Sequence, residues 1–144
     1  MLKKIPPVIS PELMKVLMEM GHGEEICLAD GNFPSAGMGK RVVRLDGHGA
    51  EEILKAMLNF FPLDTFVEKP VSLMETVSDS EPKPKIWDGY ENIIRSSEEA
   101  GVFNGFEMVE RFEFYERAKK CFAVVATGET ALYANIILKK GVVV

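Results

Sequence analysis

Two polar residues flank the first apolar run of the chain and could act together on a ligand. His22 stands between two glycines in "GHGEEICLAD", and Asp30 ends the same run. The flanking glycines leave the imidazole uncovered and let the backbone bend sharply. The ring follows a helical pattern, and the negative end of a helix suits a protonated imidazole. We interpret His22 as a proton donor; the alternative is a surface histidine that only caps the last helical carbonyls.

Asp30 lies where a predicted strand ends. Ligands of open α/β sheets bind beyond the C-terminal ends of strands, where an ionised carboxylate can accept hydrogen bonds from ligand hydroxyls. The alternative is an aspartate that only starts a turn. His48 is an internal control, because it also stands between two glycines but precedes a predicted helix and has no strand-terminal acid nearby. We interpret His48 as a surface turn residue.

A second group of polar residues crowds the predicted helix 111–120, "RFEFYERAKK". Arg111 adds a cation to the polar residues of the chain, and Tyr115 adds a phenol. The alternative to a functional role is a solvated charged face with pairs one turn apart, which is sufficient to explain Glu116 and Arg117.

Tyr133 and Asn135 flank Ala134 at the start of the last long predicted strand. Alternate residues of a strand point to the same side of the sheet, so the phenol and the amide share one face. They are either a plain cross-strand pair or two hydrogen-bonding groups for a polyol. With a proton donor, a carboxylate and an arginine, and without a nucleophile motif or a phosphate-binding glycine loop, these residues suit proton transfer on a neutral, hydroxyl-rich ligand.

The composition excludes several classes of function. The 144 residues carry a net charge of −5 with scattered Lys and Arg, so an electrostatic footprint for nucleic acid is absent. No apolar run approaches the roughly 20 residues that span a bilayer, so we expect no membrane contact. The two histidines are isolated, and Cys27 and Cys121 lie in apolar runs, which predicts buried thiols and no metal site. We expect a cytoplasmic protein with one domain, residues 1–144.

Alternating helices and strands must position these residues. Ser10, Pro11 and Glu12 predict a helix start, and Gly21 is placed for a left-handed helix end. Helical patterns fall in 11–20, 46–61, 86–101 and 111–120, and strand patterns in 25–30, 41–45, 64–77, 121–127 and 133–140. Pro70 marks an edge or a bulge, and 31–40 and 78–84 are loops. The alternation predicts an α/β domain whose helices cover the faces of a largely buried sheet.

Three segments resemble one family, that of the fucose mutarotases and ribose pyranases: "ISPELMKVLMEMGHGEEICLADGNFP", "VVRLDG" and "RFEFYERAKKCFAVVATGETALYANIILKKGV". The likeness is strong over the first fifty residues and the last thirty-five, and residues 64–109 resemble the family only in outline. "RFEFYERA", "GHGEEI" and "FP" are similar to the fucose branch. Ribose pyranases resemble the same frame but usually carry a histidine where Arg111 stands.

The resemblance implies a three-layer α/β/α domain with a mixed sheet and the interconversion of sugar anomers without a cofactor. Position by position, it implies that His22 is the proton donor and that the sugar is contacted by Asp30, Arg111, Tyr133, Ala134 and Asn135. It also implies a homo-oligomer, commonly a ring-shaped decamer of two pentamers, with sites near subunit boundaries. His48 matches nothing functional.

The expected substrate is L-fucose, with D-ribose second. The activity is then that of an L-fucose mutarotase, and a ribose pyranase that interconverts pyranose and furanose forms is the first alternative. A non-catalytic sugar-binding or transport-accessory protein is the second, and a structural ring with a vestigial pocket is the third.

Overall fold

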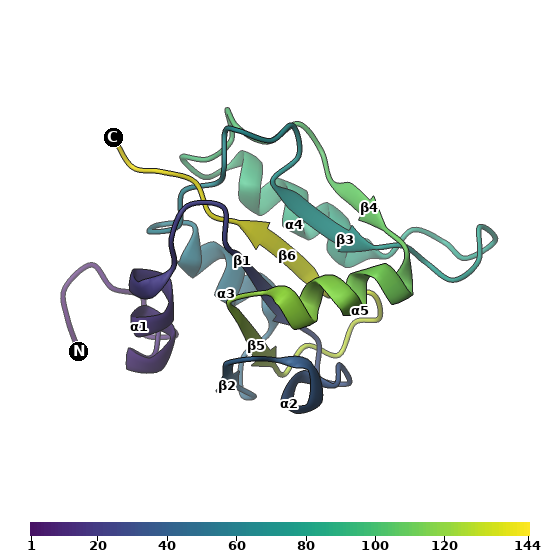
Figure 1. Cartoon of the computed structure of the whole chain (residues 1–144), viewed down its shortest axis with the longest axis horizontal. Helices are drawn as coiled ribbons and strands as arrows, with labels where there is room; N and C mark the ends of the chain where they lie inside the picture. The colour runs from purple at the N-terminus through teal and green to yellow at the C-terminus, as the bar shows by residue number, and fades with distance from the viewer.

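One mixed sheet of six strands, in the order β2-β5-β1-β6-β3-β4, forms the centre of the computed structural model, which describes residues 1–144 (Figure 1). The strands are β1 (Glu25–Ala29), β2 (Val42–Leu45), β3 (Val71–Met74), β4 (Glu107–Val109), β5 (Ala123–Thr127) and β6 (Ile136–Lys139). β5 runs parallel to β1 and β2, and β4 runs parallel to β3. β6 is antiparallel to both of its neighbours, β1 and β3.

Helices cover both faces of this sheet: α1 (Pro11–Glu19), α2 (Ser35–Met38), α3 (Ala50–Met57), α4 (Lys85–Arg95) and α5 (Arg111–Lys120). Residues of α1, α3 and α4 join one core of 30 buried residues, and α5 joins a core of 10 on the other face. Figure 1 shows α4 behind the sheet and α5 in front of it. The predicted α/β class with a mixed sheet between helices is confirmed. No helix has the length and apolar composition needed to cross a membrane.

The strand directions place the candidate residues at two opposite ends of the sheet. At one end β1 runs out into Asp30, and β6 begins directly after Asn135. At the other end Glu25 pairs with Lys139, and the turn that holds His22 lies just before β1. The five residues of β1 lie between these ends and span about 13 Å at the usual rise of a strand.

The start of α1 follows the sequence prediction, and its end does not. The Ser10 hydroxyl accepts a hydrogen bond from the Leu13 N–H at 3.1 Å, with Pro11 in the first turn. The left-handed conformation predicted for Gly21 is wrong, because α1 ends on an extended residue and the positive φ of 82° belongs to Gly23. His22 therefore sits in an exposed turn whose bend comes from the glycine after it.

Further details differ from the sequence prediction. The segment 31–40, predicted as a loop, contains the short helix α2, and the strand predicted over 64–77 forms only at Val71–Met74. β6 begins only at Ile136, and Tyr133 has a φ of +57°, so the strand predicted from residue 133 is wrong over its first three residues. The short β4 was not predicted. Pro70 marks neither an edge nor a bulge: it lies just before β3, an interior strand, and its carbonyl accepts from the Lys139 N–H at 2.9 Å.

Candidate functional site

A cavity of about 220 Å³ opens where β1 and β3 end and β6 begins. It is lined by Asp30, Asn32, Phe33, Pro34, Met74, Val77, Arg111, Tyr115, Leu132, Tyr133 and Asn135. Pockets for drug-sized ligands measure roughly 300–1,000 Å³, so this one suits a single small ring. Four of the five residues predicted to bind a ligand therefore meet in one place, although they come from opposite ends of the sequence.

Asp30 is half-buried at the edge of this cavity. Its carboxylate accepts a hydrogen bond from the Asn32 N–H at 2.9 Å, and its own N–H donates to Oδ1 of Asn135 at 2.8 Å. Burial raises the pKa of the Asp30 carboxyl above its ordinary value despite these hydrogen bonds, and the nearby Glu129 carboxylate adds to the rise. The charged carboxylate is thus under-solvated, and hydroxyl donors of a bound ligand would relieve that cost.

The segment Tyr133–Asn135 brings two polar side chains to the cavity and hides the residue between them. The Tyr133 phenol oxygen accepts a hydrogen bond from the Val77 N–H at 3.2 Å, and Asn135 is buried against Asp30. Ala134 is completely buried and does not line the cavity. The Ala134 side chain cannot reach a ligand in the cavity. Any ligand contact at this position would have to come from the main chain.

Arg111, the first residue of α5, presents its guanidinium at the cavity without a carboxylate partner. No acid lies within ion-pair distance, and the nearest aromatic contact is its neighbour Phe112, with the ring centroid 4.8 Å from Cζ. Tyr115 follows one turn later and packs against Phe33, with ring centroids 5.7 Å apart. The cavity therefore has one cation free to bind ligand oxygens and an apolar aromatic wall beside it.

Arg117, on the same helix, forms ion pairs with residues far away in the sequence, which its spacing along the helix does not indicate. Its guanidinium binds Glu25 at 2.7 Å and Glu107 at 2.6 Å, which joins α5 to the first residues of β1 and β4. The pairing one turn apart predicted for this residue is wrong, whereas Glu116 does pair along the helix, with Lys119 at 2.9 Å. Arg117 therefore does not compete with Arg111 for a ligand.

His22 lies at the opposite end of the sheet and has a partner of its own. Its Nε2 atom is 3.0 Å from Oδ1 of Asp64, and its ring stacks at a tilt on Phe66 with centroids 4.8 Å apart. The Asp64 side chain is 3% exposed and the imidazole 42%. Burial acts to raise the pKa of Asp64, but the Phe66 N–H, the imidazole and Lys139 outweigh it, and the pKa falls below its ordinary value. Asp64 is therefore a buried carboxylate that fixes an exposed imidazole.

The structure does not bring His22 and the cavity together within one chain. Asp30 follows β1 and His22 precedes it, so the strand itself, about 13 Å long, lies between them. His22 is absent from the cavity lining. A single chain thus separates the residues predicted to bind a ligand from the histidine predicted to donate a proton, and we call these two groups half-sites.

One protein family matches the part of the chain that contains both half-sites. The model of the RbsD / FucU transport protein family matches residues 3–143, which includes His22, Asp64 and the whole cavity lining. The chain belongs to the RbsD / FucU family. The family resemblance found in the sequence is thereby confirmed, and it now extends over the middle of the chain as well.

Several proteins that have been named or crystallised with a sugar are similar to this chain in sequence and structure. Fucose mutarotase of Homo sapiens is 52% identical over 147 residues, which is 98% of this chain and 94% of that protein. The crystal structure of the Streptococcus pneumoniae fucose mutarotase in complex with L-fucose has a TM-score of 0.90 and 49% identity, covering 99% of this chain and 100% of that one. The structure of Bacillus subtilis RbsD complexed with D-ribose aligns over 100% of both chains, with a TM-score of 0.73 and 24% identity. At this identity the likeness shows only that the two chains share a fold.

The sequence did not predict that Asp64 contacts His22, because the residues around Asp64 give little local indication of such a role. Asp64 stands in "FPLDTF", at the first residue of the predicted strand 64–77 and 42 residues from His22. It reaches the imidazole because its N–H donates to the Lys139 carbonyl at 3.0 Å, at the end of β6 that pairs with the start of β1. Only the long-range strand pairing of this RbsD / FucU chain reveals the contact.

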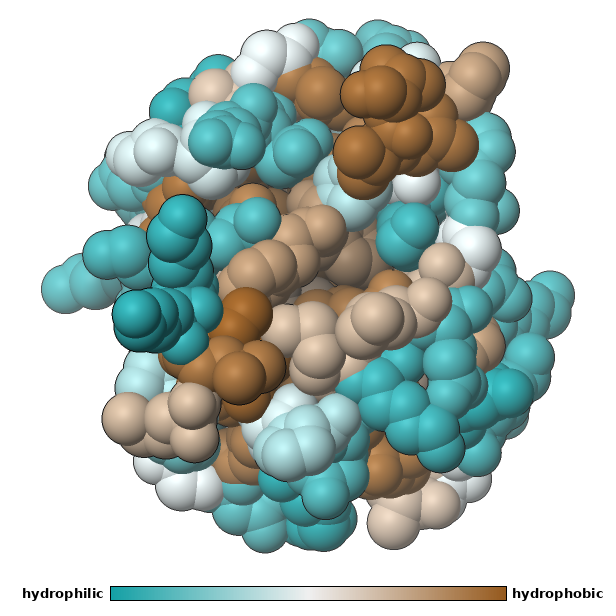
Figure 2. Space-filling view, turned by 90° about the vertical axis from the view of Figure 1, so that its left-hand side faces the viewer, coloured by the Kyte–Doolittle hydropathy of each residue, from teal (hydrophilic) through white to brown (hydrophobic).

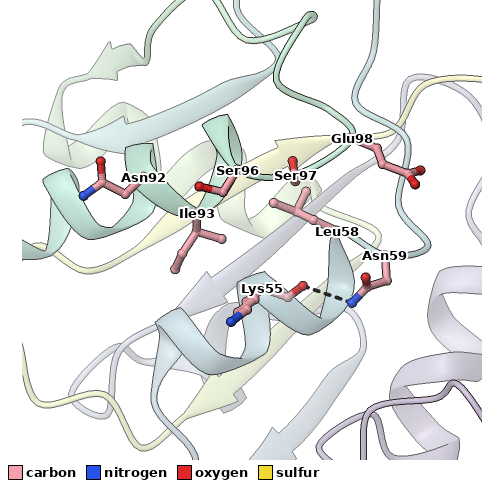
Figure 3. A pocket seen from close by; sticks show the side chains of 8 residues that line it. All are labelled: Lys55, Leu58, Asn59, Asn92, Ile93, Ser96, Ser97 and Glu98. Carbon is pink, nitrogen blue, oxygen red and sulfur yellow. Dashed lines mark hydrogen bonds between the residues drawn. The ribbon is translucent and has the colours of Figure 1, made fainter.

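A larger groove of about 420 Å³ lies between α3 and α4 and does not carry the site (Figure 3). Its lining is Lys55, Leu58, Asn59, Asn92, Ile93, Ser96, Ser97 and Glu98. Figure 3 shows one hydrogen bond among them, from the Asn59 amide to the Lys55 carbonyl at 3.3 Å. None of the predicted site residues lies in this groove.

Proposed function

We propose that the protein is an L-fucose mutarotase, an isomerase that interconverts the α and β anomers of the free sugar. The observation that carries the proposal is the match, at 49% identity and across the whole chain, to a fucose mutarotase crystallised with L-fucose. The cavity supports it, because it combines a carboxylate, an amide, a phenol and an unpaired guanidinium with an apolar wall. Such a mixture satisfies both the hydroxyls and the carbon face of a sugar.

In this proposal the cavity residues hold the sugar hydroxyls and His22 moves a proton. Ring opening breaks the bond between C1 and the ring oxygen; that oxygen takes a proton from the imidazolium, and the anomeric hydroxyl gives one to a base. Rotation about C1–C2 turns the aldehyde, and the ring closes on its other face with the protons returned. Acid–base assistance of this kind is worth about 10²–10⁴-fold, or roughly 3–5 kcal/mol of barrier. The reaction involves no net oxidation or reduction, so it needs no redox cofactor.

Asp64 and Tyr115 take supporting parts in this reaction. When the Nε2–H of His22 donates to Asp64, the other ring nitrogen, Nδ1, faces the sugar, so the carboxylate sets which nitrogen exchanges the proton. The base is either a water or a hydroxyl-bearing side chain. Tyr115 is the candidate that the cavity offers, because its side chain lines the wall next to Arg111.

Because one chain separates its half-sites, the proposal requires a neighbour. His22 of one copy would enter the cavity of the next, and a head-to-tail contact of this kind repeats until it closes into a ring. The surface supports such a contact at both ends. Phe66, next to His22, is 73% exposed, while Val77 and Leu132 at the cavity rim are 64% and 71% exposed. Figure 2 shows the face that carries both chain termini, toward which β6 runs in Figure 1. Apolar side chains gather on it around a hollow, and the cavity lies at the opposite end of the sheet.

The proposed assembly is a homo-oligomer, a ring-shaped decamer of two stacked pentamers, as the family resemblance implies. The proposed partners are the monosaccharide and further copies of this chain, without nucleic acid or membrane. The net charge of −5 opposes binding to a phosphate backbone. We place the protein in the cytoplasm, where its two buried free thiols, Cys27 and Cys121, stay reduced.

Saturation-transfer NMR on an equilibrated L-fucose sample tests the function. Magnetisation should pass between the α and β anomer peaks faster with the protein than without it. Binding without faster exchange would identify a sugar-binding or transport-accessory protein, and absence of binding would identify a structural ring. A panel of L-fucose, galactose, D-ribose and arabinose ranks the substrates. We expect fucose first, because Arg111 stands where ribose pyranases usually carry a histidine, and ribose second.

A further inference from the structure

Tyr133 adopts a backbone conformation that bulky side chains avoid. Its φ of +57° lies in the left-handed region, which costs a non-glycine residue free energy because Cβ approaches the backbone. It is one of only two non-glycine residues with positive φ, and the other, Lys4, is exposed near the N-terminus. A conformation of this kind persists only where its surroundings hold it.

Two side chains of α4 hold the two carbonyl groups that directly follow the strained φ of Tyr133. The indole Nε1–H of Trp87 donates to the Tyr133 carbonyl at 2.8 Å, and the phenol of Tyr90 donates to the Ala134 carbonyl at 2.6 Å. Trp87 and Tyr90 are three residues apart, so they lie on one face of the helix. Both are buried, Tyr90 completely. Burial raises the pKa of Tyr90 far above its ordinary value, so its hydroxyl remains a donor.

The segment held in this way carries two of the cavity's polar groups. From the strained turn, the Tyr133 phenol reaches the Val77 N–H, and the Asn135 amide reaches the Asp30 N–H. An extended Tyr133 would follow the alternation of a strand and redirect the phenol and the amide relative to each other. The carbonyl anchors therefore decide where the sugar-facing groups point, although neither Trp87 nor Tyr90 lines the cavity.

We infer that Trp87 and Tyr90 are positioning residues for sugar binding, acting through the main chain of Tyr133 and Ala134. This inference rests on the proposed function, since it assigns a second layer to the same cavity. Binding and proton transfer then depend on different parts of the molecule. α4 positions the groups that hold the sugar, whereas His22 and Asp64, at the opposite end of the sheet, carry out the proton transfer. Loss of an anchor should weaken binding and leave the catalytic rate of the saturated enzyme unchanged.

Three variants on α4 test the inference. Tyr90→Phe and Trp87→Phe each remove one donor and keep an aromatic ring in the core. Ile94→Val, one turn beyond Tyr90 and also fully buried, loosens the same helix without touching the segment. The dissociation constant for L-fucose is measured by calorimetry, the maximal anomer-exchange rate by NMR, and Tm by thermal unfolding.

We expect Tyr90→Phe and Trp87→Phe to raise the dissociation constant about threefold to tenfold, the worth of one hydrogen bond, with the maximal rate unchanged. Ile94→Val should lower Tm and leave the dissociation constant at its wild-type value. Unchanged affinity in both aromatic variants would overturn the inference, as would a loss of affinity in all three that follows Tm. Should Trp87→Phe not fold, the nearly isosteric Tyr90→Phe decides alone. Failure of the proposed function is seen separately, because the wild-type protein would then show no exchange.

Discussion

The Nε2 atom of His22 lies 3.0 Å from Oδ1 of Asp64, a carboxylate with 3% of its side chain exposed. The same oxygen accepts the Phe66 N–H at 3.1 Å, so Asp64 is anchored to the main chain of its own turn. A rigid buried acid thus holds an imidazole that is 42% exposed on its other side. This contact fixes the ring orientation, and in the proposed reaction Nδ1 is the nitrogen that exchanges the proton.

His22→Gln should lower the maximal rate of anomer exchange by about 10²–10⁴-fold, the usual worth of acid–base assistance. The glutamine amide can still donate to Asp64 but cannot transfer a proton. NMR exchange spectroscopy at saturating L-fucose measures the rate. The matched control is His48→Gln, since His48 also stands between glycines but bonds the exposed Glu52 at 3.1 Å. Equal rates for the two variants would exclude His22 as the acid.

Asp64→Asn should also lower the maximal rate while leaving sugar affinity intact. The amide keeps an oxygen for the Phe66 N–H, but removes the charge that orients and stabilises the imidazolium. The expected loss is about tenfold or more, up to the roughly 10⁴-fold of a catalytic histidine deprived of its carboxylate. The measurement is the maximal rate together with the L-fucose dissociation constant. A changed affinity with an unchanged rate would place Asp64 in binding instead.

The sequence predicts those elements whose signals are local. The Ser10 cap with Pro11, the buried apolar run of β5 and the helix opening at Arg111 are all found where expected. β4 was not predicted, because it has only three residues and only Val109 is buried, so its sequence shows no alternation of apolar and polar residues. The left-handed turn at Tyr133 escaped because a bulky residue gives no signal for positive φ; the anchors that impose it come from α4.

The site divides in the same way. Residue chemistry indicated His22 and Asp30, and the cavity gathers Asp30 with Arg111, Tyr133 and Asn135 as the resemblance implied. Sequence proximity misled on one point. Eight positions separate His22 from Asp30. Because β1 runs between them, the two residues lie at opposite ends of the sheet. Asp64 depends on antiparallel pairing with β6, which no local pattern encodes.

Asp30→Asn should stabilise the fold at neutral pH while weakening sugar binding. Burial raises the pKa of Asp30, so the folded protein binds this proton more tightly than the unfolded chain. Its charge therefore costs stability above the folded pKa, and the cost disappears as pH falls below the unfolded value of about 3.9. Tm of the variant should exceed wild type at pH 7 and approach it near pH 3.5. Loss of a charged hydrogen-bond acceptor should raise the L-fucose dissociation constant about tenfold to a hundredfold.

The exposed Asp79→Asn is the control for this comparison, because Asp79 lies in the loop between β3 and α4 without a hydrogen-bond partner. It should change neither Tm nor affinity. A lower Tm for Asp30→Asn at pH 7 would contradict the predicted cost of ionisation.

Arg111→Met and Arg117→Met should have opposite consequences, although both residues belong to α5. Arg111 has no acidic partner, so its loss should weaken L-fucose binding and change the free energy of unfolding by less than about 0.5 kcal/mol. Loss of Arg117 leaves Glu25 and Glu107 without their shared cation and should destabilise by about 1–3 kcal/mol, with affinity retained. Urea unfolding and calorimetry measure the two effects, and reversed effects would contradict the division of roles.

Mixing two impaired variants, assayed at an L-fucose concentration well below the weakened dissociation constant of Asp30→Asn, tests whether neighbouring chains share the site. His22→Gln keeps an intact cavity, and Asp30→Asn keeps an intact proton donor. If His22 of one copy serves the cavity of the next, co-refolded rings contain some contacts with both groups intact. Random 1:1 mixing should restore about one quarter of the wild-type exchange rate, since each intact half is present with a chance of about one half. If each chain carried a complete site, mixing would restore nothing. The same two variants mixed without refolding control for residual activity, because subunits that do not exchange cannot complement each other.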